Sequence, residues 1–382
     1  MKQALEGVKV VDLSRVLAGP FCTMLLADLG AEVIKVERPE TGDDSRYFGP
    51  FKGKESMYFQ GINRNKRSIE MNLKDETEKA NFIEMVKEAD VVVENFRPGT
   101  MEKLGLSYEE LKKYNPQLIY AATSGFGRTG PYSEKPAYDL TIQALSGLMS
   151  ITGQENGRPT KVGSSIADIN AGIFTALGIM TALFHREKTG EGQLVDVSML
   201  DCQISILENA FARYCATGEN PEPIGNRHPA ITPFSMFDTK DDYVVVAIGN
   251  EKLWKIFCQA IGKENLIEDE RFASNQLRTE NRHQLEEVLT PLFKSQTTRE
   301  WIEQLEAEGI PCAPVNRISD VLENEQVKAR KMFATVEHPE IGELNLPGMP
   351  IKFSETPGVI REAAPRLGEH NGFYKHEGDR KE

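Results

Sequence analysis

The sequence predicts an α/β protein whose large domain is Rossmann-like, with a parallel sheet, and whose smaller domain is also α/β. Three observations predict this fold class. Short apolar runs alternate with helical patterns through the first part of the chain, long helical patterns follow from Asp139, and a turn-rich stretch at residues 218–226 precedes further strands and helices. A chain of 382 residues is also long enough for two domains.

The N-terminal residues contain the clearest unit of strand, helix and strand. An apolar run at residues 8–13 predicts a strand, Ala18-Gly19-Pro20 a turn, residues 21–29 a helix and residues 32–36 a second strand. Strands that alternate with helices pair in parallel, so this pattern predicts one mostly parallel sheet with helices on both faces. Further strands are expected at residues 68–73, 91–93 and 117–121, and a helix at residues 76–88.

Helical patterns dominate the next part of the chain. Helices are expected at residues 140–150 and 165–187, and in the second of these the apolar residues have the spacing of a largely buried helix. A short strand at residues 193–197 separates it from a helix at residues 200–214.

The turn-rich segment at residues 218–226 is expected to be a linker. We expect a large Rossmann-like domain at residues 1–217, completed by residues 330–382, and a small domain at residues 227–329. The small domain and the tail should contain strands at residues 243–248 and within 333–353, and helices at residues 251–261, 282–294 and 299–308.

Composition and charge exclude several classes of protein. A formal net charge of -13 argues against a nucleic-acid or anionic-membrane partner, because both attract basic surfaces. We expect neither a signal peptide nor an apolar window of membrane-spanning length, and therefore a cytoplasmic protein. The cysteines and histidines are scattered without ligand spacing, so disulfides, a metal site and a tightly bound cofactor are not expected.

Basic residues accompany several predicted strands. Arg38 follows the second strand, where an arginine suits a phosphorylated ribose better than the acid typical of NAD sites. Lys66 and Arg67 lie in a basic segment before the third strand, and Arg97 follows the fourth. Together they predict a phosphate-binding crevice for NADP or coenzyme A (CoA). Taken singly, each of the two basic loops is better explained as a solvated surface, and Arg38 is explained equally well in either way.

Asp168 is the only acid between Glu155 and Glu187, and it lies where a long apolar helix begins. With Ser165 it has the spacing of a capping box, in which both side chains bond free amides at the helix start. Helix capping is the more common role of such an acid. Asp139 also precedes a helix, and the neighbouring Tyr138 has a hydroxyl for hydrogen bonding and a ring for packing.

These residues belong to a longer set of motifs that resembles the class III CoA-transferases, the formyl-CoA transferase-like CaiB/BaiF family. The resemblance extends through nearly the whole chain. Its carriers include Ala18-Gly19-Pro20, Glu37-Arg38-Pro39, Asn65-Lys66-Arg67-Ser68, Glu94-Asn95-Phe96-Arg97-Pro98-Gly99, Asp168, Gly225-Asn226-Arg227-His228-Pro229 and Gly309-Ile310-Pro311-Cys312-Ala313-Pro314.

The resemblance implies a reaction. In the family, the aspartate at the position of Asp168 attacks an acyl-CoA to form a mixed anhydride and then an aspartyl-CoA thioester, which passes CoA to an acceptor acid. Amides at the helix start are expected to keep this carboxylate ionised. The implied assembly is an interlocked, ring-shaped homodimer. CoA contacts are implied at Arg38, Asn95, Lys103, Lys66, Arg67, Arg97 and Lys135, and substrate contacts at Tyr138, Asp139, Arg15 and Val16.

Alternative functions stay open at this point. Acyl-CoA racemases of the same fold carry a histidine where this chain has Tyr138, and loss of that base favours CoA transfer. An NADP-dependent oxidoreductase is suggested by Arg38 but lacks the glycine fingerprint. A non-catalytic CoA-binding protein is the remaining alternative. The glycine-run loop of oxalate-specific members is missing after residues 225–229, so the resemblance does not single out oxalate as the acceptor.

Overall fold

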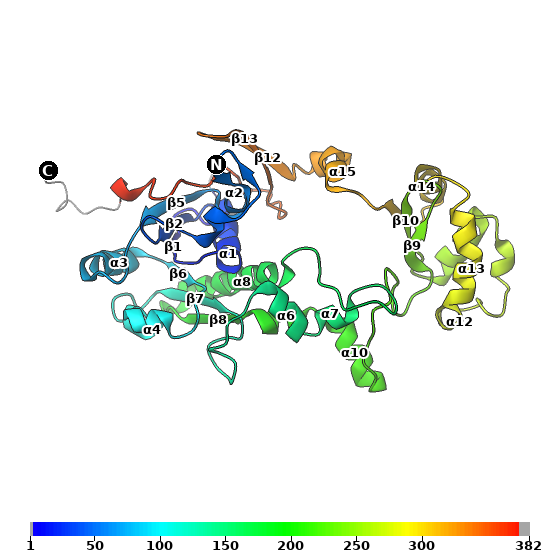
Figure 1. The fold of residues 1–382 in the computed structure, drawn as a ribbon, viewed down its shortest axis with the longest axis horizontal. Coiled ribbons are helices and arrows are strands. Elements are labelled where there is room, and N and C mark those ends of the chain that lie inside the picture. The colour runs from blue at the N-terminus through cyan, green and yellow to red at the C-terminus, as the bar shows by residue number, and fades with distance from the viewer. Residues whose placement is uncertain (1–2, 374–382) are drawn as a thin grey trace. The chain divides into compact units, whose positions relative to one another are not determined.

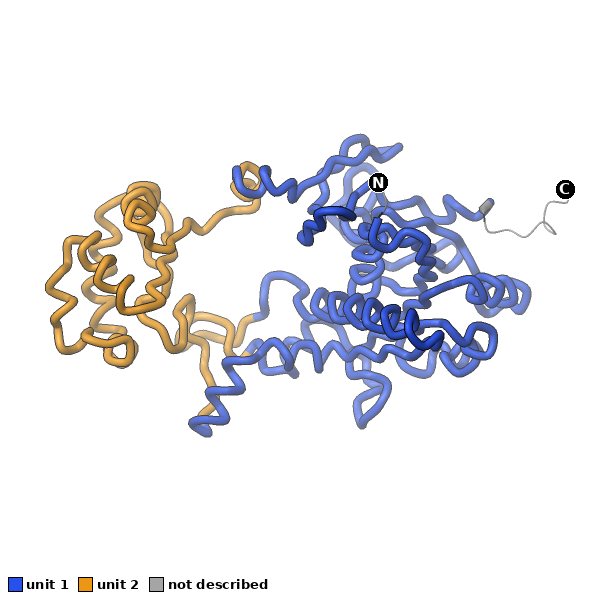
Figure 2. Tube along the Cα trace, turned by 180° about the vertical axis from the view of Figure 1, so that it is seen from behind, with its two compact units in different colours: residues 1–149, 161–218, 325–382 blue, residues 150–160, 219–324 orange. Residues whose placement is uncertain are grey.

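The structure is a computed structural model that describes residues 3–373 (Figure 1). The described residues form two compact units (Figure 2). Unit 1 contains the chain up to Met149, Lys161–Gly218 and the chain from Glu325, and unit 2 contains Ser150–Thr160 and Glu219–Asn324.

The boundaries differ from the expected ones at two places. Ser150–Thr160 belongs to unit 2, although we expected it in the large domain, and residues 325–329 belong to unit 1. Contacts distant in sequence explain the first difference. The guanidinium of Arg227 lies 2.8 Å from the carboxylate of Glu155, and the amide of Gly225 donates to the carbonyl of Gly153.

Unit 1 is built on one sheet of six parallel strands, which confirms the predicted α/β fold. The order β5-β2-β1-β6-β7-β8 is that of doubly wound nucleotide-binding sheets. It reverses between β1 and β6, and ligands bind beyond the carboxyl ends of the strands at such a point. The strands are β1 (Lys9–Asp12), β2 (Glu32–Glu37), β5 (Lys66–Glu70), β6 (Val91–Glu94), β7 (Ile119–Ser124) and β8 (Leu194–Ser198).

Helices cover both faces of this sheet, and the central strands are apolar on both sides because neither side meets water. One apolar core joins Val11 of β1 to Phe82 of α3, and a second joins Val10 to Leu26 of α1 and Ile179 of α8. The helices of the two cores are α3 (Glu76–Glu88), α4 (Thr100–Leu104) and α5 (Tyr108–Leu111) for the first, and α1 (Ala18–Asp28) and α8 (Ile166–Thr189) for the second.

Helix α8 has two apolar faces. One face is buried, whereas Ile173, Leu177, Met180 and Phe184 are exposed on the other at spacings of three and four residues. The helix is long and apolar enough to cross a membrane by length and composition, so the expectation that no window meets these criteria was wrong. A core helix with a second apolar face passes the same test, because length and composition do not record what the helix packs against.

Two predicted helices are each divided into two. The helix expected at residues 140–150 is interrupted at Gly147, whose φ of 91° is in the left-handed region. The helix expected at residues 200–214 is likewise interrupted, and its second part ends at the left-handed Gly218. The resulting helices are α6 (Asp139–Leu145), α7 (Leu148–Ile151), α9 (Met199–Ser205) and α10 (Glu208–Thr217).

Unit 2 has its own apolar core, in which Trp254, Phe257 and Trp301 are fully buried. Its sheet is antiparallel with the order β11-β10-β9, of which only β10 was predicted. The elements are β9 (Phe234–Asp238), β10 (Tyr243–Ala247), β11 (Cys312–Pro314), α11 (Glu251–Ala260), η2 (Glu264–Leu266), α12 (Asn275–Glu280), α13 (Arg282–Phe293), α14 (Thr298–Ala307) and α15 (Ile318–Glu323).

The C-terminal segment returns to unit 1. The side chain of Asn65 donates to the carbonyl of Val359 and accepts from the amide of Arg361, at 2.9 and 2.7 Å. These bonds tie the tail beside the start of β5. The remaining elements are η1 (Asp44–Tyr47), β3 (Phe51–Lys52), β4 (Glu55–Ser56), α2 (Met57–Asn63), α16 (Glu325–Ala329), β12 (Phe333–His338), β13 (Gly342–Pro347) and η3 (Asn371–Phe373).

Candidate active site

Two neighbouring cavities lie beyond the carboxyl ends of β1 and β6, where the strand order reverses. Their volumes are about 560 and 180 Å³. Arg15, Phe96 and Arg97 line both of them, so the two cavities meet along the loops that follow these strands. We call the larger one the basic cavity and the smaller one the Asp168 cavity.

The basic cavity is lined by cations from four loops. Arg15, Arg38, Lys74 and Arg97 follow β1, β2, β5 and β6 respectively. Asp44 pairs with two of them, at 2.7 Å from Arg15 and 2.8 Å from Arg38. The carboxylate therefore holds two guanidinium groups side by side, and these donors suit a phosphate ligand.

The Asp168 cavity contains the carboxylate in the first turn of α8. Burial, with a further contribution from the charge of Asp139, raises the pKa of Asp168 to about 7. Among the described residues no hydrogen bond or ion pair to this carboxylate is found. The expectation that helix amides keep it ionised was therefore wrong, because no amide bonds this carboxylate to offset its loss of hydration.

Asp139, not Ser165, caps the amino end of α8. Its Oδ1 accepts from the amide of Ala167 at 2.9 Å, and its Oδ2 accepts from Gln143 at 2.7 Å. Ser165 is the N-cap residue but makes no side-chain cap bond, so the predicted capping box was wrong. The cap comes from a residue distant in sequence, and this leaves Asp168 unbonded in the cavity.

Close packing brings Asp168 to the start of α1. Gly172 lies one turn after Asp168 on the same face of α8. A Cβ added at Gly172 would lie 2.7 Å from the carbonyl oxygen of Ala18, so the two helices are in backbone contact there. Ala18, Leu17 and Val16 consequently line the cavity together with Asp168.

Most of the residues predicted for the site lie around these cavities. Asn95, Lys135 and Tyr138 line the Asp168 cavity, and Tyr138 is 74% exposed at its rim. Asp139 acts behind Asp168 rather than as a lining residue. The predicted residues that line one or both cavities are Arg15, Val16, Arg38, Asn95, Arg97, Lys135, Tyr138 and Asp168.

Besides Asp139, three predicted residues line neither cavity. The ammonium of Lys66 is fully buried, 3.1 Å from Asp12 and 2.9 Å from Asn63, and burial lowers its pKa to about 8. Arg67 lies 3.4 Å from Glu32. Lys103 is an exposed residue of α4, between two residues that line the basic cavity. Lys66 thus neutralises a buried acid in the fold.

Sequence reasoning missed several residues of the site. Asn72, Leu73 and Lys74 line the basic cavity, and a cation just after a predicted parallel strand was the available signal for Lys74. Tyr58 of α2 was also missed. Burial and the charges of Asp168, Asp43 and Asp139 raise the pKa of Tyr58 to about 12, which places its hydroxyl in an acidic setting near the nucleophile candidate.

Comparison with known proteins identifies the family. The profile of CoA-transferase family III matches residues 5–371. The chain belongs to CoA-transferase family III. This family III CoA-transferase is 43% identical over 383 residues to the acetyl-CoA:oxalate CoA-transferase of Acetobacter aceti, covering 98% of this chain and 96% of that protein.

Other relatives agree with the assignment. Succinyl-CoA:glutarate CoA-transferase of Homo sapiens is 40% identical, covering 96% of the family III CoA-transferase described here and 84% of the relative. The crystal structure of a CAIB/BAIF family protein from Brucella suis superposes with a TM-score of 0.87 at 39% identity, covering 98% of both chains. The resemblance is confirmed and the chain is a CoA-transferase, so the oxidoreductase and the non-catalytic binding protein lose their support.

Proposed function

We propose that this family III CoA-transferase moves CoA from an acyl-CoA thioester to a small carboxylic acid through intermediates on Asp168. One observation carries the proposal: an unbonded carboxylate, with a pKa raised to about 7, lies in a cavity beside a basic one. A poorly solvated carboxylate that is half ionised near neutrality is a better nucleophile than a fully hydrated one.

The reaction consists of four acyl transfers. The Asp168 carboxylate attacks the thioester carbonyl, and CoA thiolate leaves as the mixed anhydride forms. The thiolate attacks the aspartyl carbonyl, which gives aspartyl-CoA thioester and releases the donor acid. The acceptor carboxylate then attacks the carbonyl of this thioester, the C–S bond breaks, CoA thiolate leaves, and a second anhydride forms on Asp168. Attack by thiolate on the acceptor carbonyl releases the new acyl-CoA and restores Asp168.

The basic cavity is the proposed site for the phosphates of CoA. Arg38, Arg97 and Lys74 supply charge from the ends of adjacent strands. Arg97 and Phe96 continue into the Asp168 cavity, where Lys135 is also found, so a nucleotide in the first directs its pantetheine arm to the second. CoA enters as a substrate, without a tightly bound cofactor. The assignments of Asn95, Lys66, Arg67 and Lys103 as CoA contacts are weaker, because Asn95 and Lys66 are already bonded within the protein and Arg67 and Lys103 lie outside both linings.

We further propose that the acceptor is a short dicarboxylic acid. The names of the two relatives above include oxalate and glutarate, both of which carry two carboxylates. In the Asp168 cavity Lys135 is available to pair with the carboxylate that does not react, while Tyr138 lies at the rim.

The protein is proposed to act in the cytoplasm as an interlocked homodimer. The exposed apolar face of α8 supports the dimer, because Leu177 and Phe184 are 59% and 63% exposed in the single chain. The acidic net charge argues against a nucleic-acid or anionic-lipid partner for this surface.

Intact-mass measurement tests the mechanism. The protein is incubated with acetyl-CoA or succinyl-CoA, trapped with hydroxylamine or borohydride and mapped by peptide mass. Wild type should carry the adduct on Asp168, and Asp168→Ala should lose the adduct and all measurable transfer while remaining folded. Transfer that persists in Asp168→Ala would exclude the mechanism. Deuterium uptake beside the thioester carbonyl, without transfer, would instead support a racemase.

A further inference from the structure

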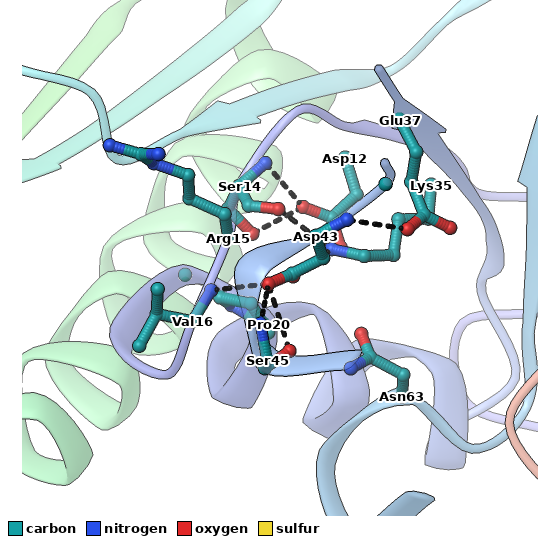
Figure 3. A network of polar contacts seen from close by, with 12 residues as sticks. Asp12, Ser14, Arg15, Val16, Pro20, Lys35, Glu37, Asp43, Ser45 and Asn63 are labelled. Atoms are coloured by element: carbon teal, nitrogen blue, oxygen red, sulfur yellow. Dashed lines mark hydrogen bonds and ion pairs between the residues drawn. The ribbon is translucent and has the colours of Figure 1, made fainter. Parts of the chain in front are cut away.

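The loop between β1 and α1, residues 14–16, is held by bonds to nearly all of its backbone polar groups. The amide of Ser14 donates to Asp12 at 2.9 Å, and its carbonyl accepts from the ammonium of Lys35 at 2.7 Å. The amide of Val16 donates to Oδ1 of Asp43 at 3.0 Å. Figure 3 shows these contacts converging on the loop from β1, β2 and the segment that follows β2.

Asn95 holds the middle of the same loop. Its Oδ1 accepts from the amide of Arg15 and its Nδ2 donates to the carbonyl of Arg15, both at 2.8 Å. The side chain thus links the end of β6 to the loop after β1, and it bonds both the amide and the carbonyl of Arg15. A group already used in this way is poorly placed to serve also as a ligand contact for CoA.

The loop needs this restraint because of Val16. Its φ of 66° is in the left-handed region, which β-branched residues rarely adopt. Asp43 accepts its amide while its other oxygen lies 2.9 Å from the ammonium of Lys35, and both of these side chains are almost fully buried. Lys35 in turn bonds Ser14, so one ion pair holds both ends of the loop.

The same loop forms the wall between the proposed reaction centre and the basic cavity. Arg15 lines both cavities, and Val16, Leu17 and Ala18 line the one with Asp168. Ser14 packs tightly against Gly19 at the start of α1, since a Cβ added at Gly19 would lie 2.2 Å from that of Ser14. The first amides of α1 have no acceptor within the helix, so a shift of the loop would move free donors relative to Asp168.

We propose that Asn95 and the Lys35–Asp43 pair are positioning residues for CoA transfer, which act by holding residues 14–16 against Asp168. The proposal rests on the proposed function. It assigns Asn95 a different role from the CoA contact expected from the family resemblance. The two roles predict opposite kinetic results, because a lost ligand contact raises KM, whereas a displaced reaction centre lowers kcat.

Asn95→Ala tests the proposal in the full-length enzyme with an acyl-CoA and a dicarboxylate. We expect kcat to fall by about 100-fold, as a displacement near 1 Å produces, with the KM for acyl-CoA within about twofold of wild type. The rate of adduct formation on Asp168 at saturating acyl-CoA should fall by the same factor. A raised KM with unchanged kcat, or wild-type values for both, would overturn the proposal.

Asn115→Ala is the matched control. Like Asn95, Asn115 bonds the backbone with both ends of its amide, but at the opposite end of the strands. Its Nδ2 donates to the carbonyls of Val86 and Ala89 at 3.0 and 2.8 Å, and its Oδ1 accepts from the amide of Gln117 at 3.0 Å. Asn115→Ala should lower the free energy of unfolding at least as much as Asn95→Ala, because it loses three side-chain bonds rather than two, and should leave kcat unchanged. Equal kcat losses in both variants would show a general effect of instability and refute positioning.

Asp43→Asn examines the second holding group independently. The substitution keeps an acceptor for the Val16 amide but removes the charge that pairs with Lys35, so kcat should fall with little change in KM. The outcomes separate failure of the proposed function from failure of this inference. If the proposed function fails, Asp168→Ala still transfers CoA. If this inference alone fails, Asp168→Ala is inactive, but the Asn95 and Asp43 variants keep the kcat of wild type.

Discussion

Asp168 lies in a cavity that disfavours its charge, whereas the proposed mechanism requires its charged form. Burial and the neighbouring Asp139 raise its pKa to about 7. The folded protein therefore binds a proton on Asp168 more tightly than the unfolded chain does. Ionised Asp168 therefore lowers the free energy of unfolding above pH 7. This penalty shrinks as the pH falls below about 7 and is absent below the ordinary aspartate range.

The pH dependence of the reaction should reflect this pKa, and Asp139→Asn should change it. In wild type, kcat/KM should rise with pH and reach half of its plateau near pH 7, since the ionised form is the nucleophile. Asp139→Asn removes a negative charge, so the midpoint should move to lower pH. It keeps an acceptor for the Ala167 amide but loses the bond from Gln143, at a cost of about 1 kcal/mol in stability.

A pH–rate profile of both proteins with one acyl-CoA checks this. Chemical denaturation at pH 8 supplies the stability comparison. A midpoint that does not move would mean that burial alone sets the pKa of Asp168, and a midpoint that rises would contradict the electrostatic explanation.

Residues at the ends of strands were predictable from sequence, whereas residues joined by tertiary contacts were not. Arg38 and Arg97 follow apolar runs that had to be parallel strands, so their meeting at one edge followed from the fold class. Asp139 caps a helix that begins far along the chain, and Lys66 turns inward to Asp12. No local pattern distinguishes an inward lysine from a solvated one.

At the scale of elements, the contact between α1 and α8 positions Asp168, the proposed nucleophile. The packing of the two helices depends on the absence of a side chain at Gly172, where the carbonyl of Ala18 makes the contact. The pairing of strands and the two-sided burial of β1 and β6 were predictable from continuous apolar runs. Strands β9 and β11 were missed because short antiparallel edge strands carry little periodicity.

Gly172→Ala should therefore separate the two helices and lower both stability and activity. The added Cβ would lie 2.7 Å from a backbone oxygen, so the net cost should be about 1–3 kcal/mol despite the higher helix propensity of alanine. Gly61→Ala in α2 is the control, because no atom lies within 4 Å of its added Cβ. That variant should be as stable as wild type or more so. Thermal unfolding and steady-state rates measure both, and a harmless Gly172→Ala would show that the helix contact is adaptable.

At the scale of the whole molecule, the division into two units was expected but one of its segments was not. Residues 218–226 carried turn signals, whereas Ser150–Thr160 joins unit 2 through the ion pair of Arg227 with Glu155. Such pairing across the sequence has no local signature. The exposed apolar face of α8 could not be predicted from sequence either, because a helix with two apolar faces has the same sequence pattern as a fully buried helix.

In the proposed homodimer the second chain covers the exposed apolar face of α8, and Leu177→Glu tests this. Leu177 lies at the centre of the exposed stripe between Ile173 and Phe184. A charge there would be buried without a partner in the dimer, so the fraction of chains that assemble and sediment as dimer should fall. Gln117→Glu adds the same charge at an exposed position away from the stripe and should leave this fraction unchanged. Sedimentation velocity over a range of concentrations measures both variants. A wild-type chain that stays monomeric and pellets with phosphatidylcholine vesicles would instead mean that lipid covers α8, because its length and composition also suit a membrane.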